Sequence, residues 1–320
     1  MKKQVIRLFL AAALIFSCSM QAFALPDTLI PGGCTIGIKL CSKGLIVTGF
    51  EESSAAQAAG LRKGDVIIKA NGEWIHTASS LRERLTGSDI VLTVRRQGKE
   101  AEFCVKPTKT EYGPRIGAFV RDTMAGIGTV TYYDPDTGSF GALGHGVSDA
   151  DTAMLMPMEV GVVVHSSVAN VEKSSVGKPG ELKGKFDVHR IMGSVAQNTE
   201  RGIFGKLTDP IPGEPIPVGC ADDTSPGQAV ILSNISGTNI RSYSAEIVRI
   251  YPHATDTGRN MLIRITDPQL ISATGGIVQG MSGGPIIQDG KLVGAVTHVL
   301  VNDPTTGYGI FIENMLDAAA

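Results

Sequence analysis

The sequence lacks a surplus of basic residues and, after its first segment, long apolar runs. Its 29 Lys and Arg residues oppose 31 Asp and Glu, which gives a formal net charge of −2. Nucleic-acid binding needs a basic surface, so we expect no nucleic acid as a partner. Beyond residues 1–24 no stretch is apolar enough to cross a bilayer as a helix.

Motifs for metals and nucleotides are also missing. The sequence contains no C-x-x-C pair, no H-E-x-x-H, no G-x-x-x-x-G-K-[ST] and no dinucleotide fingerprint after a strand. We therefore expect neither a metal nor a cofactor. Four cysteines follow residue 24, at Cys34, Cys41, Cys104 and Cys220. They are either free thiols or include one disulfide, of Cys34 with Cys41 or Cys104.

Aromatic residues are few, whereas turn-forming residues are plentiful. The 320 residues include one Trp, 39 Gly and 16 Pro. Many tight turns are typical of short-stranded β architectures, and this length exceeds what a single core usually supports. The composition favours a mostly β protein with two domains.

Residues 1–24 have the pattern of an export signal. Basic residues at Lys2, Lys3 and Arg7 precede an apolar run over 8–16, and a small-x-small cleavage pattern ends at Ala24. We expect an exported protein whose mature chain begins near Leu25. An uncleaved N-terminal membrane anchor is the alternative, which would keep the protein beside a membrane.

Residues 31–107 predict a small α+β unit. Strands are expected at 36–40, 45–48, 65–70 and 90–96, helices at 55–59 and 79–85, and a hairpin turn at 71–72. The segment Gly60-Leu61-Arg62-Lys63-Gly64-Asp65-Val66-Ile67, followed by Asn71-Gly72, resembles a bacterial PDZ domain.

This resemblance implies a site for a peptide tail, which could come from the chain itself or from a membrane protein. A loop including Gly33 would hold a terminal carboxylate, and an edge strand through Ile36, Gly37 and Ile38 would pair with the peptide backbone. The alternative is a PDZ unit that only packs against the next domain.

Residues 112–320 predict a second, mostly β domain with a terminal helix over 312–319. Its strongest motif is Gly280-Met281-Ser282-Gly283-Gly284-Pro285. In such a turn, the N–H groups of Gly280 and Ser282 could form an oxyanion hole around a nucleophilic Ser282. His145 stands between glycines after an expected strand and upstream of Ser282, as a general base would.

The region from Ser282 onward resembles chymotrypsin-like serine proteases, which have a double β-barrel. This resemblance implies that Thr297, His298 and Val299 bind the substrate backbone. Together with Gly-His-Gly at 144–146 and Asp267, these motifs resemble the stage IV sporulation protein B peptidase family over nearly the whole chain.

The family resemblance implies Asp267 as the triad acid, fifteen positions before Ser282. Spacing in chymotrypsin-like folds favours Asp187 instead, and Asp267 in Thr-Asp-Pro also suits a turn cap. The resemblance further implies export to the forespore intermembrane space, self-cleavage, and cleavage of a membrane-bound regulator that leads to activation of a mother-cell sigma factor during sporulation.

Two hypotheses follow. In the first, the chain is a serine endopeptidase acting on protein or peptide substrates, with Ser282, His145 and Asp267 in catalysis. In the second, it is an exported PDZ adaptor whose second domain keeps the protease shape without turnover.

Overall fold

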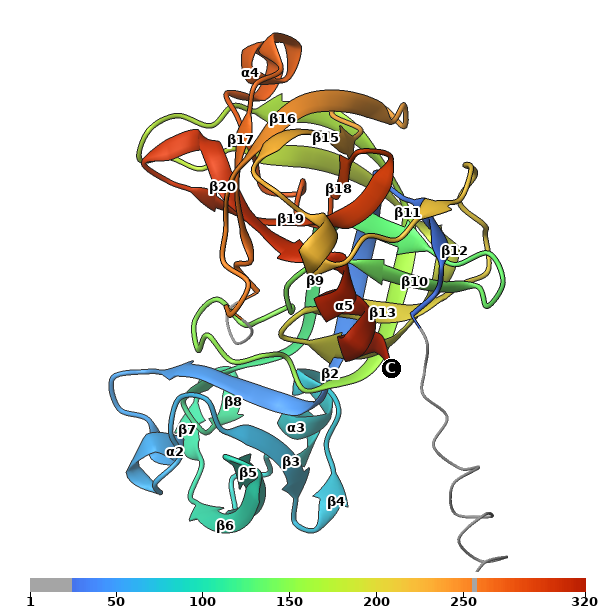
Figure 1. Cartoon of the computed structure of the whole chain (residues 1–320). Helices are drawn as coiled ribbons and strands as arrows, with labels where there is room; N and C mark the ends of the chain where they lie inside the picture. Colours follow the sequence, from blue (N-terminus) through green and yellow to red (C-terminus); the bar gives the residue numbers. More distant parts are fainter. Residues whose placement is uncertain (1–24, 255–257) are drawn as a thin grey trace, which may run out of the picture.

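A computed structural model describes residues 25–254 and 258–320. The predicted mostly β class is confirmed, and two closed β-barrels pack together above a smaller PDZ unit (Figure 1). None of the helices in the described ranges is long and apolar enough to span a membrane. The predicted export signal over 1–24 lies outside the described residues.

Barrel one is closed by six strands that pair in a ring. In ring order they are β2 (Thr35–Phe50), β9 (Ala118–Tyr133), β10 (Ser139–Ala142), β13 (Gly202–Leu207), β12 (Glu181–Thr199) and β11 (Met158–Glu172). Every neighbouring pair is antiparallel. The short strands β1 (Thr28–Pro31) and β14 (Ile216–Pro217) extend the sheet beyond β9.

Barrel two is formed by the C-terminal part of the chain. Its ring order is β15 (Gly227–Ser233), β16 (Arg241–Ile250), β17 (Met261–Ile265), β20 (Asp303–Phe311), β19 (Lys291–Leu300) and β18 (Pro285–Gln288). The 3-10 helix η1 (Ala221–Asp223) precedes it, and α4 (Pro268–Thr274) lies between β17 and β18. The final helix α5 (Ile312–Ala319) packs its buried Ile312 and Met315 against both barrels.

The PDZ unit lies below the barrels and has its own core. It contains β3 (Val66–Ala70), β4 (Glu73–Trp74), β5 (Ile90–Arg96), β6 (Lys99–Val105), α2 (Ala55–Ala58) and α3 (Ala78–Arg84). The pair β7 (Thr108–Thr110) and β8 (Gly113–Arg115) forms the connection to barrel one. Buried Asp65 accepts two hydrogen bonds from Arg96, which ties the end of β5 to the loop before β3.

The predicted peptide-binding strand of the PDZ unit is not an edge strand. Residues 35–41 of β2 pair with β9 on one side, and residues 36–42 pair with β11 on the other. Ile36 faces Gly128 in β9 and His165 in β11, so its backbone is enclosed within barrel one. The prediction that Gly33, Ile36, Gly37 and Ile38 bind a peptide is therefore wrong.

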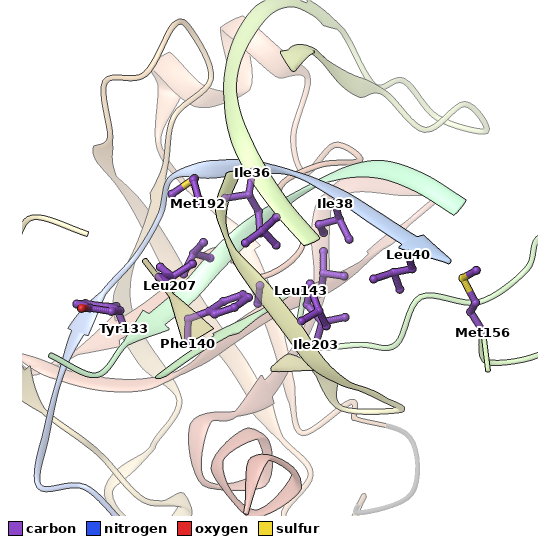
Figure 2. Close-up of a cluster of buried hydrophobic side chains, with 14 of the residues drawn as sticks. Ile36, Ile38, Leu40, Tyr133, Phe140, Leu143, Met156, Met192, Ile203 and Leu207 are labelled. Carbon is purple, nitrogen blue, oxygen red and sulfur yellow. The ribbon is translucent and has the colours of Figure 1, made fainter. Parts of the chain in front are cut away.

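The side-chain pattern of this segment explains the correction. Ile36, Ile38 and Leu40 are buried and point into the core of barrel one, where they meet Phe140 and Leu143 (Figure 2). Burying an aliphatic side chain of this size contributes about 1.5–3 kcal/mol. Three such side chains on one face favour the barrel core over an exposed PDZ edge. The first half of β2, which lies inside the PDZ unit predicted over 31–107, thus belongs to barrel one.

The place beside the second half of β2 is taken by β9. Residues 118–121 of β9 pair with residues 46–50 of β2, inside the PDZ unit. The carboxylate of Asp122 then accepts a hydrogen bond from Ala78 N at the start of α3. One continuous strand therefore belongs to the PDZ sheet at its start and to barrel one at its end.

Candidate active site

A cleft of about 1210 Å³ brings together the predicted nucleophile and base. Its lining includes His145, Ser282, Thr297, His298 and Val299. Small-molecule sites usually measure about 300–1,000 Å³, so the space suits a longer, extended ligand. The cleft joins residues of both barrels, since His145 follows β10 whereas Ser282 precedes β18.

The loop that carries Ser282 depends on two glycines with left-handed backbone angles. Gly280 has φ +97° and Gly283 has φ +94°, a region that side chains with a Cβ rarely adopt. At Gly283 an added Cβ would also lie 2.0 Å from the carbonyl oxygen of Thr129. Glycine at 283 is therefore required for the nucleophile loop to approach β9 of barrel one.

Strand β9 holds this loop through two buried hydroxyl groups. Thr129 Oγ1 donates to Gly280 O at 2.7 Å, and Thr131 Oγ1 donates to Gly283 O at 2.8 Å. The backbone N–H of Thr129 donates to Ser282 O at 2.9 Å. Barrel one therefore positions the peptide groups on both sides of the serine.

The loop leaves two N–H groups unused. The N–H groups of Met281, Gly283 and Gly284 donate to backbone carbonyls. Within residues 25–254 and 258–320, those of Gly280 and Ser282 donate to no other group of the chain. Two free donors beside a serine hydroxyl are what an oxyanion hole needs.

His145 is held in the tautomer that a general base requires. Its Nδ1 lies 2.9 Å from Gly146 O, and because a carbonyl can only accept, Nδ1 carries the proton. This leaves Nε2 as an acceptor. Burial lowers the pKa of His145 below 6.5, and the bond to Gly146 O opposes that shift. The imidazole is therefore neutral at neutral pH.

The His145 loop and the Ser282 loop are in backbone contact. A Cβ on Gly283 would lie 2.5 Å from Leu143 N, and a Cβ on Gly144 would lie 2.9 Å from Thr297 Cγ2. In this conformation Ser282 Oγ donates to Thr297 O at 2.8 Å instead of to His145. Catalytic hydrogen bonds often form only with substrate bound, and rotation about the Ser282 side chain would release its hydroxyl from Thr297.

His298 accompanies His145 in the cleft. The two ring centroids are 5.2 Å apart, with planes tilted by 39°. Burial, His145 and Arg259 lower the pKa of His298 to about 4, in that order of importance. Arg259 also lines the cleft and stacks over the ring of Tyr308. His298 is therefore a neutral residue of the cleft.

Asp267 has a different partner from the one that the sequence indicated. Its carboxylate caps α4 by accepting from Gln269 N at 2.9 Å and Leu270 N at 3.0 Å. A third bond comes from Ser244 N. In this conformation Asp267 does not orient His145, because its oxygens satisfy the N-terminus of a helix at another part of barrel two, outside the lining of the cleft. The turn cap that the sequence also allowed is what the structure shows.

Asp187 does not contact His145 either. It lies on β12, exposed, and accepts a hydrogen bond from His189 N. Among the described residues, the Nδ1–H of His145 is satisfied by the Gly146 carbonyl and by no carboxylate. The role usually given to a triad acid, fixing the histidine tautomer, is filled here by a backbone oxygen.

Metal-binding clusters and activated thiols are the other groups that could carry chemistry in a protein of this composition. No cluster of three or more His, Cys, Asp or Glu residues suited to a metal occurs within the described ranges. The four cysteines at 34, 41, 104 and 220 are free thiols in this structure. Burial raises the pKa of Cys34 to about 11, so this thiol is not an activated nucleophile.

Several residues of the site were not predicted from the sequence. Thr129, Thr131 and the Gly146 carbonyl position the reacting groups, while Glu200 and Arg259 add charges to the cleft. The alternation Thr129-Val130-Thr131 in a strand could have indicated two hydroxyls on one face. Nothing in the local sequence indicates which loop those hydroxyls meet.

Two six-stranded barrels share a cleft that is faced by a serine loop from one barrel and a histidine from the other. This is the fold of chymotrypsin-like serine proteases, here joined to a PDZ domain. The PDZ domain family matches residues 34–106. The family described as SpoIVB peptidase S55 matches residues 112–316, and the chain belongs to that family.

Individual relatives match shorter regions. A "Putative zinc metalloprotease" of Agrobacterium fabrum is 32% identical over 108 residues, which are 33% of this chain and 28% of that protein. A "Probable periplasmic serine endoprotease DegP-like" of Chlamydia trachomatis is 37% identical over 70 residues, 21% of this chain and 14% of that protein. The chain thus spans less than a third of the length of these curated relatives.

Among solved structures, the active form of the Rv3671c protease from M. tuberculosis has 16% identity and a TM-score of 0.34. The match covers 61% of this chain and 73% of that one. The PDZ domain of the SdrC-like protein from Listeria monocytogenes has 20% identity and a TM-score of 0.23, covering 24% of this chain and 87% of that domain.

Proposed function

We propose that Ser282 is the nucleophile of this endopeptidase and His145 its general base. The observation that carries this assignment is the contact of the two loops across one cleft, with His145 Nε2 left as an acceptor. Rotation of the Ser282 side chain from Thr297 O towards Nε2 starts the reaction. The hydroxyl oxygen then attacks the substrate carbonyl as its proton passes to His145.

The remaining groups of the site stabilise the charges that develop on the substrate oxygen and on His145 during the reaction. The N–H groups of Gly280 and Ser282 bind the oxyanion that forms on the substrate carbonyl. The imidazolium of His145 keeps its Nδ1–H on the Gly146 carbonyl and donates the Nε2 proton to the leaving amine. Water then hydrolyses the acyl-enzyme by the same route in reverse.

We further propose that the enzyme is exported and acts in regulation during sporulation. Membership of the S55 family and the signal-like pattern of residues 1–24 support this role. The enzyme would cleave itself near the start of its mature chain. It would then cleave a membrane-associated regulatory protein in the forespore intermembrane space, which leads to activation of a mother-cell sigma factor.

A fluorophosphonate probe tests the nucleophile, because only an activated serine reacts with it. We expect labelling of the wild type and none of Ser282→Ala, with Ser233→Ala as a control that stays reactive. Labelling of neither wild type nor control, under all ligand conditions, would favour the catalytically silent PDZ adaptor.

Self-cleavage is tested by expressing the wild type and Ser282→Ala side by side in the same host. N-terminal sequencing should find a further cut, beyond the expected mature start near Leu25, in the wild type alone. Equal processing in both proteins would assign the cleavage to another protease and remove self-cleavage from the proposal.

A further inference from the structure

A short hairpin that follows His145 carries a buried carboxylate that the proposed reaction does not use. The chain folds back on itself here, with Met156 N donating to Val147 O at 2.9 Å and Asp149 N donating to Met154 O at 2.8 Å. Asp149 is only 1% exposed. A buried carboxylate is normally paired and hydrogen-bonded, so the partners of Asp149 indicate what it does.

Asp149 shapes the tip of the hairpin. Its Oδ1 accepts hydrogen bonds from Asp151 N at 3.1 Å, from Thr152 N at 2.8 Å and from Thr152 Oγ1 at 2.9 Å. The turn closes with Ala153 N donating to Asp149 O at 2.8 Å, and Ala153 has a left-handed φ of +56°. A residue with a Cβ keeps such a backbone angle only where its surroundings fix it. The carboxylate of Asp149 therefore holds the tip in one conformation.

The second oxygen of Asp149 binds a strand outside the hairpin. Oδ2 accepts a hydrogen bond from one terminal nitrogen of Arg121, whose other terminal nitrogen bonds Asp151 at 2.9 Å. Arg121 lies on β9, and its backbone pairs with Ile46 of β2. Burial acts to raise the pKa of Asp149, but hydrogen bonds from Thr152 and Arg121 outweigh it and the pKa is lowered. Asp149 and Arg121 therefore form a charged pair at neutral pH.

Strand β9 thus holds the chain on both sides of His145. Before the histidine, Leu143 N donates to Thr129 O at 3.2 Å. After the histidine, the tip of the hairpin is bound to Arg121. The same strand fixes the serine loop, since Thr129 N donates to Ser282 O at 2.9 Å. One strand is therefore the common support for both reacting side chains.

We propose that Asp149 and Arg121 are positioning residues, which fix the hairpin so that the imidazole of His145 faces Ser282. This proposal rests on the assigned roles of Ser282 and His145. The base of the hairpin has a separate anchor, because the side chain of Asn198 on β12 bonds both of its arms. Without Arg121 the tip can swing about that base, and the histidine moves with it. Misplacing a catalytic group by about 1 Å can cost about a hundredfold in rate.

A matched pair of variants tests the role of Asp149. Asp149→Asn keeps the size of the side chain and removes the charge that binds Arg121. Asp151→Asn is the control, because this carboxylate binds the same arginine from the surface, where its side chain is 50% exposed. For hydrolysis of a short acyl ester, we expect kcat to fall about tenfold in Asp149→Asn and less than about twofold in the control, with little change in KM. Equal kcat in the two variants, both folded by urea unfolding, would overturn the proposal.

A double variant tests whether the two residues act as one contact. The side chain of Arg121 is 36% exposed, so Arg121→Gln should fold even if Asp149→Asn does not. Alone it should lower kcat about tenfold. Both substitutions together should cost no more than either one, because each removes the same contact. A multiplied loss of about a hundredfold would show that the residues act separately, and would count against the pair.

Titration of His145 by NMR separates this proposal from the catalytic assignment. It is done in the Ser282→Ala background, with the Cε1–H signal assigned through His145→Gln. Burial lowers the pKa of His145, so an imidazole released from its position should have a pKa closer to 6.5. The double variant of Arg121→Gln and Asp149→Asn removes one charge of each sign, so a rise in this pKa reports a change of position.

We expect the pKa of His145 to rise in the double variant and not in Asp151→Asn. A rise supports the positioning role even if Ser282 proves not to be a nucleophile. No rise in the double variant overturns the proposal, whatever the activity of the wild type.

Discussion

Substitution of Thr129 by valine should impair catalysis through the nucleophile loop without touching the substrate. Thr129 is fully buried, and its hydroxyl donates to Gly280 O at 2.7 Å. Valine has nearly the same shape and removes only the donor. A buried acceptor that loses its partner costs about 1–3 kcal/mol.

That free energy can appear in stability, in rate, or in both. If it is lost from the transition state, where the N–H groups of Gly280 and Ser282 must align, kcat falls by about 5-fold to about 150-fold, at 1.36 kcal/mol per factor of ten. KM should change little, because the oxyanion exists only after attack.

The assay is hydrolysis of a short acyl ester under saturating conditions, together with urea unfolding of each variant. Thr131→Val is the matched control, because its hydroxyl bonds Gly283 O on the far side of the serine. We expect similar losses of stability from both variants and a larger loss of kcat from Thr129→Val. Equal kcat in Thr129→Val and the wild type would refute the view that β9 aligns the oxyanion hole.

Three further predictions concern pH, the capping aspartate and the PDZ unit. Because burial lowers the pKa of His145, kcat/KM should reach half its maximum below pH 6.5. A midpoint above 6.5 in the pH profile would contradict this. The stability that neutral His145 contributes is likewise present above pH 6.5 and is lost as the pH falls. Asp267→Ala should lower the free energy of unfolding by about 0.5–2 kcal/mol through loss of the α4 cap, with less than a tenfold change in kcat/KM. A loss near four orders of magnitude would instead show that Asp267 orients His145 in the active conformation. Asp65→Ala should destabilise the PDZ unit by about 3 kcal/mol in urea unfolding, because Arg96 and Arg62 N lose their buried acceptor, while ester hydrolysis stays unchanged.

The local motifs predicted much of this protein. Strand, turn and helix signals located the elements of the PDZ unit, since Asn71-Gly72 and the helix stop at Gly60 act within a few residues. The Gly-rich loop around Ser282 was likewise recognisable, because Gly280 and Gly283 adopt the positive φ angles that glycine favours, and this preference is visible in the local sequence.

Prediction failed where the local sequence fitted two different structural roles equally well. The alternating segment Ile36 to Leu40 suits an edge strand of a PDZ domain and an interior strand of a barrel equally well by pattern. Its pairing with both β9 and β11 was decided by residues about 90 and 125 positions away in the chain. Asp267 suits both a triad and a helix cap, and the cap is satisfied by N–H groups two and three residues away.

The sequence by itself determined the kinds of element, the glycine positions of the serine loop and the residues that we propose as nucleophile and base. Only the tertiary structure decided that β9 links the PDZ sheet to the catalytic cleft, that Thr129 and Thr131 hold the serine loop, and that a backbone carbonyl orients His145. The physical reason is range: turns and caps depend on neighbours within a few residues, whereas strand pairing and loop contact depend on which distant surfaces bury each other.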